Sequence, residues 1–526
     1  MIMKRVYLAI ATTLALCFYG CTNNEVVDNN VQTERPGTVF LTSKDVTTRT
    51  HTKTDLTSKF EFFWDKLYMW GHAGDKIFVE STPGTWLTSD LGKVQDNEGS
   101  IATFNFPGTT LTDPDYMVYY GKSNSGNNII EIPSLQEANY TAPSSQLIGD
   151  CGVGKAVRKA SGNYTFKLHH KAAYAAVRWY CPNNTLLTSG AYTYYSVSIK
   201  ADEPMCGTYK LPNTENGHLT LVSPSSTNII SARSKWTGNV VSSTLANSDT
   251  TFFCIAPGTY HNVRIAVKMM RNGSYSTEML VAGYSSITFR ENELTPINIK
   301  LNVPDYSERN KFYMWGARNH YWYGYENEQK YDGTVGPDYP KEGDANGRYA
   351  NYQNYPFPAS VPQSTCPNTN ETLWYIQRGN PIWDDRPFMY NGKLCYGGVW
   401  FKKKSKIPGF SNIVAPDGAD YRNNTNITSA TAVTPTLYAG QDLSDYFYLP
   451  ALDLFRDGKY ISYTTAFNFG SNSGAEGSYW VNGPSTGGLR ILFPALEISG
   501  IRIRYAFTGV YTNTNYVTGT PLWKAE

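Results

Sequence analysis

The segment NVRIAVKM, residues 262–269, alternates apolar side chains with other residues at a period of two. Val263, Ile265 and Val267 fall on one face of an extended strand, and the residues between them fall on the other. The segment PINIKLNV, residues 296–303, repeats the pattern. Because this alternation is typical of antiparallel sheets with one face against a core, the two segments predict a mainly β fold.

The chain between residues 59 and 303 consists of short strand-like runs separated by turn residues. Examples are KIFVE (76–80) and DYMVYYG (115–121), which are rich in the aromatic and β-branched residues that favour strands. No amphipathic helical pattern interrupts them. We expect two tandem antiparallel β-sandwiches, an N-terminal one over residues 50–160 and a second over residues 161–303.

The charge balance argues against one class of partner. The chain has 526 residues, a net charge of +2 and 17% charged residues, against roughly 25% in an ordinary soluble protein. Proteins that bind nucleic acid usually carry a basic patch or stripe. We therefore expect no nucleic-acid partner.

The N-terminus is predicted to be a targeting segment. A short basic region precedes the apolar stretch VYLAIATTLAL (6–16), which is too short to span a bilayer. Cys21 follows a small residue, Gly20, and the segment resembles a bacterial lipoprotein signal peptide (1–21) that would make Cys21 the lipid-bearing first residue. Residues 22–49 then read as a tether and a removable first-strand segment: a polar stretch is followed by one short strand at TVFLT (38–42) and by a basic, Thr-rich loop around Arg49. Such a loop is suited to proteolysis, and Arg35 in the tether is the alternative cleavage position.

Six further cysteines allow two interpretations. An even number outside the cytoplasm permits disulfides, but six cysteines allow 15 pairings, among which the sequence does not choose. Isolated buried thiols are the other interpretation. No C-x-x-C pair or other metal-ligand spacing accompanies them, so we expect no metal and no cofactor.

The composition changes after a linker at about residue 303. Residues 304–526 hold more than half of the 40 tyrosines, and long Gly, Pro and Asn loops replace the regular strand runs. We expect a separate, loop-rich domain of mixed α+β structure there.

Aromatic residues supply the candidate ligand-binding positions in this last domain. Tyr321, Trp322, Tyr323 and Tyr325 cluster in the segment HYWYGYE, and Trp383 lies in NPIWDDRP. Flat aromatic faces on loops suit carbohydrate or protein recognition, although the same residues also suit a core. No nucleophile, base or paired carboxylates accompany them in a catalytic arrangement, so we do not expect an enzyme.

Two family resemblances extend this interpretation. FEFFWDKLYMWGHAGDKIFVE (60–80), EIPSLQ (131–136), FKLHHKAAYAAVRW (166–179) and IAPGTYHNVRIAV (255–267) resemble, in order, motifs of the fimbrillin-like pilins of Bacteroidales. The resemblance implies transthyretin-like sandwiches. YFYLPALDLFRDGKY (446–460) and GSYWVNGPSTGGLRILF (477–493) are similar to the Fibrobacter major paralogous domains, which implies a C-type-lectin-like fold for residues 304–526.

The resemblance implies a cell-surface accessory pilin, exported as a palmitate-bearing lipoprotein to the outer membrane and built into a fimbrium. A protease would cut after Arg49, and the strand of another pilin subunit would replace the removed first strand. The C-terminal domain would then act as an adhesin at the fibre tip, with a host or bacterial glycan or protein as ligand. The alternative is a glycan-binding outer-membrane lipoprotein of a polysaccharide-uptake system, which would keep its lipid and never polymerise.

Overall fold

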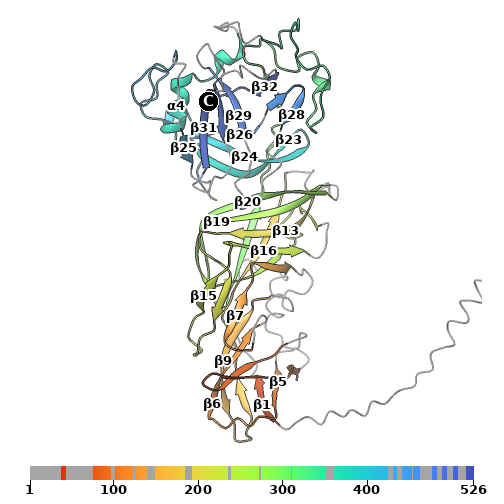
Figure 1. Cartoon of the computed structure of the whole chain (residues 1–526), viewed down its shortest axis with the longest axis vertical. Coiled ribbons are helices and arrows are strands. Elements are labelled where there is room, and N and C mark those ends of the chain that lie inside the picture. Colours follow the sequence, from red (N-terminus) through yellow and green to blue (C-terminus); the bar gives the residue numbers. More distant parts are fainter. Residues whose placement is uncertain are drawn as a thin grey trace, which may run out of the picture.

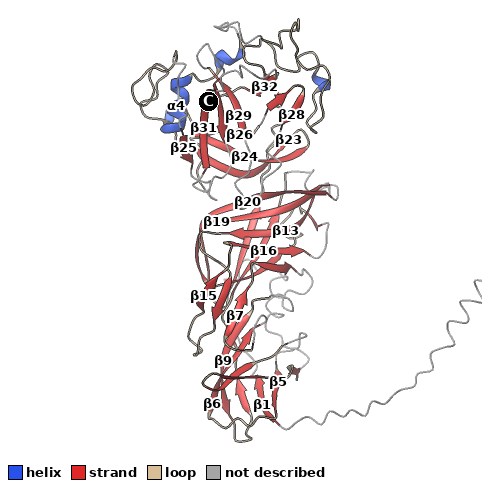
Figure 2. Ribbon diagram, in the orientation of Figure 1, coloured by secondary structure: helices blue, strands red, loops and turns tan. Residues whose placement is uncertain are grey.

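The computed structural model is mainly β. It describes a defined set of residues, with gaps between them: 37–42, 75–95, 101–121, 126–138, 148–183, 192–234, 239–271, 274–309, 311–350, 361–423, 431–434, 437, 441–452, 454–461, 477–482, 489–493, 501–507 and 517–525. Figure 2 shows strands along the whole length of the molecule and helices only at its C-terminal end. Among the described residues, the helices are too short or too polar to cross a membrane.

The described elements form three parts that follow one another along the long axis (Figure 1). We call them the base, the middle and the head. The base is a single nine-stranded sheet in the order β3-β2-β6-β9-β10-β1-β5-β4, with β11 paired to β9. Its strands are β1 (Gly37–Thr42), β2 (Phe78–Thr82), β3 (Thr85–Thr88), β4 (Lys93–Val94), β5 (Ala102–Pro107), β6 (Asp115–Gly121), β9 (Cys151–Arg158), β10 (Tyr164–Phe166) and β11 (His169–His170).

The middle consists of a three-stranded sheet (β18-β12-β21), a six-stranded sheet (β20-β19-β13-β16-β8, with β17 on β13) and a smaller sheet (β15-β14-β7). Its strands are β7 (Ile129–Ile132), β8 (Leu135–Ala138), β12 (Ala173–Tyr180), β13 (Tyr192–Lys200), β14 (Gly207–Lys210), β15 (Thr220–Pro224), β16 (Ile229–Ser234), β17 (Asn239–Val240), β18 (Thr251–Ile255), β19 (Gly258–Arg271), β20 (Ser274–Phe289) and β21 (Leu294–Lys300).

The core of the middle confirms the alternation read from the sequence. Val263, Ile265 and Val267 of β19 are buried in one apolar cluster with the alternate residues Ile297 and Ile299 of β21. The other face of β19 is also covered, since Arg264 and Ala266 are buried. Strand β19 is therefore enclosed on both faces over this stretch.

Strand pairing differs from the all-antiparallel expectation in three places. Strand β12 runs parallel to β21, β16 runs parallel to β8, and β1 runs parallel to β10. The expected boundary at residue 160 also falls inside a sheet, because β10 and β11 pair with β9 of the base. In the opposite direction, β7 and β8 precede that boundary but pair with strands of the middle. Periodicity reports which face of a strand is buried and carries no information about its partner, so these pairings could not be read from the sequence.

A buried glutamine replaces a strand partner where β8 meets β18. Gln136 donates to the carbonyl of Cys254 (2.8 Å) and accepts from the amide of Cys254 (3.0 Å). The side-chain amide thereby satisfies both backbone groups of one residue of β18, as a neighbouring strand would. A single apolar cluster continues from base to middle through Val153, Tyr174 and Cys254.

The head contains three small sheets, in the orders β22-β32-β27-β28, β23-β24-β26 and β25-β31-β30-β29. Its elements are β22 (Phe312–Tyr313), η2 (Glu326–Glu328), η3 (Pro362–Thr365), α4 (Thr369–Gln377), β23 (Ile382–Tyr390), β24 (Lys393–Lys402), η4 (Lys404–Lys406), β25 (Thr431–Thr434), β26 (Tyr446–Pro450), β27 (Leu454–Arg456), β28 (Lys459–Ile461), β29 (Gly477–Val481), β30 (Leu489–Phe493), β31 (Ile501–Phe507) and β32 (Thr518–Pro521). Helix α4 begins at a capping box, in which Asn368 and Glu371 each bind the other's backbone amide.

The last strand of the chain is part of the head's own core. Strand β32 pairs with β22 and with β27, so it joins the beginning of the head to its end. Trp523, just beyond β32, is 1% exposed and packs on Phe401 with ring centroids 4.6 Å apart. The C-terminal segment is thus enclosed in the domain that contains it.

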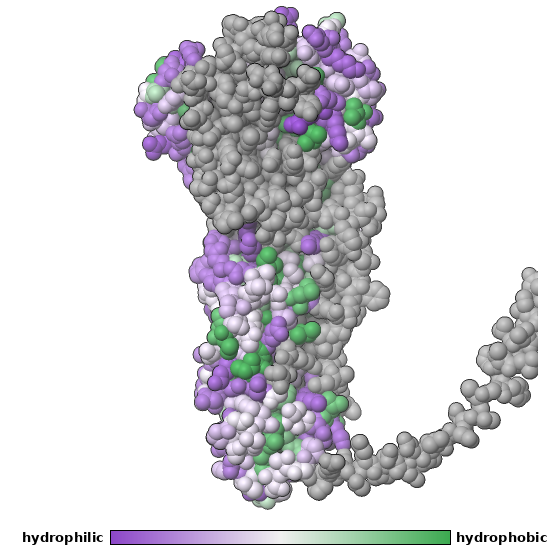
Figure 3. Space-filling model, viewed as in Figure 1, coloured by the Kyte–Doolittle hydropathy of each residue, from purple (hydrophilic) through white to green (hydrophobic). Residues whose placement is uncertain are grey.

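The cysteines of the described residues favour the interpretation as isolated buried thiols over the interpretation as disulfides. Cys151, Cys181, Cys206, Cys254, Cys366 and Cys395 are all buried, and no disulfide joins any two of them. Figure 3 shows apolar residues among hydrophilic ones on the coloured part of the surface below the head. Strand β15 is exposed throughout and includes Leu221 and Val222.

Candidate functional site

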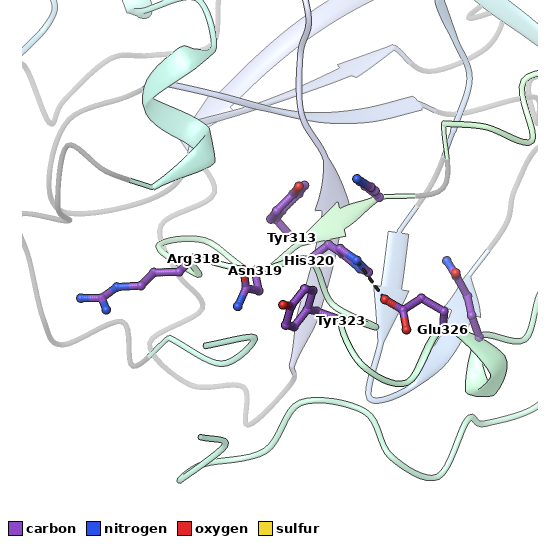
Figure 4. A pocket seen from close by; sticks show the side chains of 8 residues that line it. Tyr313, Arg318, Asn319, His320, Tyr323 and Glu326 are labelled. Atoms are coloured by element: carbon purple, nitrogen blue, oxygen red, sulfur yellow. Dashed lines mark ion pairs between the residues drawn. The ribbon is translucent and has the colours of Figure 1, made fainter. Parts of the chain in front are cut away.

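A pocket of about 540 Å³ opens on the head beside β22, in the loop that follows this strand. Its lining residues are Lys311, Tyr313, Arg318, Asn319, His320, Tyr323, Glu326 and Gln329. They come from one continuous segment of 19 positions, so local chain folding builds the whole site. Figure 4 shows His320, Tyr323 and Glu326 grouped together, with Arg318 extending away from them.

His320 lies at the centre of the pocket. Its Nε2 is 3.4 Å from Oε1 of Glu326, and its ring meets Tyr323 edge to face at 5.6 Å between centroids. Tyr313 makes a similar edge contact at 6.3 Å. Burial lowers the pKa of His320, and Glu326 opposes that shift while Lys311 and Arg348 reinforce it. A pKa below the ordinary value of 6.5 keeps the imidazole neutral at pH 7.

A buried arginine, Arg348, holds the chain that packs beneath the pocket loop. Arg348 is 4% exposed, binds the carboxylate of Asp344 through Nε and Nη2, and donates from Nη1 to the carbonyl of Asp338 (2.7 Å). Its guanidinium also stacks over the ring of Tyr325 at 4.3 Å. Because the charge is paired and hydrogen-bonded, Arg348 holds the loop in shape and is not available to a ligand.

The amides of the loop are held in the same way. Backbone N–H groups of Arg318 and Asn319 both donate to the carbonyl of Gly347 (3.0 Å each), and Asn319 Nδ2 donates to the carbonyl of Asn346 (2.7 Å). The pocket wall is therefore tied to the segment that carries Arg348. Side chains on such a wall are positioned before any ligand arrives.

Three of the five predicted aromatic positions are core residues, which corrects the prediction that they bind a ligand. Tyr321, Trp322 and Trp383 are each 0% exposed, so no ring surface is available. Tyr321 donates its hydroxyl to the carbonyl of Val517 (3.0 Å) and accepts from the amide of Gly458 (2.9 Å). Tyr321 and Trp322 pack on Phe455 of β27, and Trp383 of β23 belongs to the same apolar cluster. Loop residues such as Tyr321 and Trp322 supply part of this core because the loop-rich domain has few strands.

The other two predicted positions lie near the pocket. Tyr323 lines it and is 47% exposed. Tyr325 is half-buried against the head's core under Arg348. Sequence reasoning selected the aromatic cluster but missed the polar residues between its members. The signal that could have found them is His320, the sole histidine after residue 304.

The carboxylate next to Trp383 is also engaged. Asp384 is buried and accepts two hydrogen bonds from Arg386 Nε and one from Arg386 Nη2, at 2.8–3.1 Å, and a further one from Trp400 Nε1 (2.8 Å). Both oxygens are satisfied by the protein. Among the described residues, no group of three or more His, Cys, Asp or Glu side chains is arranged to hold a metal ion.

A second candidate site is the position of β1 in the base. Strand β1 lies between two other strands, pairing antiparallel with β5 and parallel with β10. Phe40 in its centre is 0% exposed and packs on Phe106 and Tyr164. Cys21 and Arg49, the predicted lipidation and cleavage positions, lie outside the described residues.

Comparisons with known proteins find similarity to solved structures at low sequence identity. No family model matches it, and no curated protein matches it. Among solved structures, a protein assigned to cell adhesion from Bacteroides ovatus is 11% identical and covers 51% of this chain and 92% of its own, with a TM-score of 0.30. One from Bacteroides uniformis, assigned to the same role, is 15% identical and covers 50% and 94%, with a TM-score of 0.30. A fimbrial assembly protein from Parabacteroides distasonis is 12% identical and covers 50% and 89%, with a TM-score of 0.24.

Proposed function

We propose that this protein is an accessory subunit of a cell-surface fimbrium, related to the fimbrillin-like pilins, that joins the fibre by strand exchange at the base. In this proposal the base and middle correspond to the two β domains of a fimbrillin-like pilin, and the head is a lectin-like adhesive domain. Residues 1–21 direct the chain to the outer membrane, with lipid on Cys21. The observation that carries the proposal is the position of β1.

Removal of β1 would open a groove in the interior of the base sheet. The strand is paired on both sides, with five residues in register with β5 and three in register with β10. It also supplies side-chain contacts, since Thr38 Oγ1 accepts from the amide of Leu111 (2.9 Å) and Thr42 Oγ1 accepts from the amide of Ala102 (2.8 Å). Two unpaired strand edges with an apolar floor are a template for an incoming strand.

The position of the cut decides whether the groove opens. Strand β1 spans Gly37–Thr42, after Arg35 and before Arg49. Cleavage after Arg35 leaves the strand in place, whereas cleavage after Arg49 removes it. Arg49 is therefore the position that strand exchange requires.

The enclosed C-terminus supports a position at the fibre tip. A subunit within a fibre has to donate a strand as well as accept one. Strand β32 pairs within the head on both sides, and Trp523 beyond it is buried in the head's core. We propose that β32 is not available as a donor strand, as a subunit at the end of a fibre requires.

The pocket of the head favours binding over catalysis. Glycoside hydrolysis uses two carboxyl groups, whereas Glu326 is the one carboxylate among the lining residues. The same pocket also suits the second candidate function, a glycan-binding lipoprotein of a polysaccharide-uptake system. In that case β1 would stay in place.

The mature N-terminus tests the proposal. We expect protein recovered from fibres to begin after Arg49 and to lack the peptide that contains β1. An Arg49→Ala variant should stay uncut and outside fibres, and the matched control Arg35→Ala should assemble like wild type. A surface protein that keeps lipid on Cys21 and the β1 peptide, in cells whose fibres lack it, would support the uptake lipoprotein instead.

A further inference from the structure

The head pocket has more positive charge than its own residues neutralise. Lys311 and Arg318 line it and are exposed, and within the described part of the chain neither side chain forms a hydrogen bond or an ion pair. Glu326 is the single carboxylate of the lining. Its Oε1 already accepts from the amide of Gly324 (3.2 Å) and faces Nε2 of His320.

The uncharged part of the lining matches a sugar ring. A pyranose has an apolar face of C–H groups and a rim of hydroxyls, so it needs a flat aromatic surface beside hydrogen-bonding groups. Tyr323 offers a half-exposed ring, and Tyr313, Asn319 and Gln329 contribute a hydroxyl and two amide oxygens to the same lining. The amide nitrogens of Asn319 and Gln329 already donate to Asn346 and Tyr331. A lipid or an apolar peptide would instead require an apolar lining, which the described residues of this pocket lack.

The size of the pocket fits an oligosaccharide. A volume of about 540 Å³ lies in the range of sites for small organic ligands. Figure 4 shows that Arg318 extends away from the His320–Glu326 pair, so this cation lies in a different part of the lining from Glu326. A ligand of two or three rings could therefore contact both Tyr323 and Arg318.

We propose that this pocket binds an acidic saccharide, a sugar chain in which at least one ring carries a carboxylate. The carboxylate lies next to Lys311, where it replaces the counterion that the protein does not supply, and a ring packs on Tyr323. This inference rests on the proposed adhesive function of the head, and it names the class of ligand that the adhesin recognises.

The test measures binding by the whole protein to matched pairs of saccharides, using isothermal titration calorimetry. One pair is trigalacturonic acid and its uncharged counterpart galactotriose; another is 3′-sialyllactose and lactose. We expect at least one acidic member to bind about ten-fold or more tightly than its neutral partner, since a charged hydrogen bond contributes at least that factor. A sulfated lactose distinguishes recognition of the carboxylate from recognition of any anion.

Three variants assign the effect to the pocket. Lys311→Gln should weaken acidic binding about ten-fold and leave neutral binding unchanged. Tyr323→Ala should weaken both. Lys404→Gln is the matched control, because it removes the same charge from an exposed lysine of the head that does not line the pocket.

Four results would overturn the inference. The first is equal affinity for the acidic and the neutral saccharide in both pairs, and the second is an equal effect of Lys311→Gln and Lys404→Gln. The third is tighter binding of the sulfated sugar than of both carboxylated ones, and the fourth is no binding of any saccharide at about 1 mM by a folded protein. The experiment needs no fibre. A protein that binds acidic saccharides but never enters fibres therefore refutes strand exchange alone, and a fibre subunit that binds none of them refutes the ligand class alone.

Discussion

The ring of Phe40 lies flat on the ring of Tyr164, with centroids 4.6 Å apart and 10° between the ring planes. The two residues belong to β1 and β10, which run parallel. Phe40 is therefore the residue through which the first strand closes the core of the base. Tyr164 and Phe106 would be left without this partner once β1 is removed.

Phe40→Ala should destabilise the uncut protein by about 3–5 kcal/mol, because it leaves a cavity among aromatic rings. The same substitution cannot affect protein cut after Arg49, which no longer contains residue 40. Scanning calorimetry of the two forms checks this difference. Val39→Ala, on the half-exposed face of the same strand, is the control and should change the uncut form by about 1 kcal/mol or less. Similar stabilities of the Phe40→Ala and Val39→Ala proteins would show that β1 does not close this core.

Trp523→Ala should destabilise the head selectively, by about 3–5 kcal/mol. The indole is buried and packs on Phe401 and Tyr375. Limited proteolysis should then release fragments of the head while base and middle stay intact. The neighbouring exposed Lys524→Ala is the control. Unchanged resistance of Trp523→Ala would mean that the C-terminal segment can leave the head at little cost, and it would then be free to donate a strand.

Native protein should not react with iodoacetamide at its six described cysteines. All six thiols are buried, and burial raises the pKa of Cys366 to about 12, so the reactive thiolate is scarce at pH 8. Alkylation after denaturation without reductant should then label all of them. Mass spectrometry counts the labels. Labels that appear only after reduction would reveal disulfides, and labelling of the native state would reveal an exposed thiol.

The head should lose stability as the pH falls through about 6.5. Burial lowers the pKa of His320 in the folded state, whereas the unfolded chain has the ordinary value near 6.5. The unfolded state therefore binds more protons in the range between the two values, and proton binding favours unfolding there. His320→Gln should flatten this dependence. Melting temperatures of both proteins from pH 8 to pH 5 measure it, and parallel curves would assign the acid sensitivity to other groups.

The sequence could predict which residues of β19 and β21 face the core, because alternation is a property of a single strand. It could not predict that β12 pairs in parallel with β21, a strand that lies about 120 positions later, since pairing depends on how the whole chain folds. For the site, the segment around residues 320–325 was identified for its aromatic rings. Tyr321 and Trp322 proved to be core residues, and their neighbours His320 and Tyr323 line the pocket. Burial does not alternate with a fixed period along an irregular loop. The sequence pattern therefore does not separate buried from exposed residues there.

The chain passes between base and middle at least three times: from β6 to β7, from β8 to β9 and from β11 to β12. Between middle and head the described elements show a single passage, after β21. An adhesive head pulled by its ligand would transmit tension to the base along these connections. Several covalent connections share the force between base and middle. The head is joined to the middle by one described connection and by packing, since Met389 of β23 is buried in the apolar cluster of the middle. Under tension this apolar contact would have to separate before the head could turn about the connection after β21. The contact between head and middle is therefore the place where we expect the molecule to yield first.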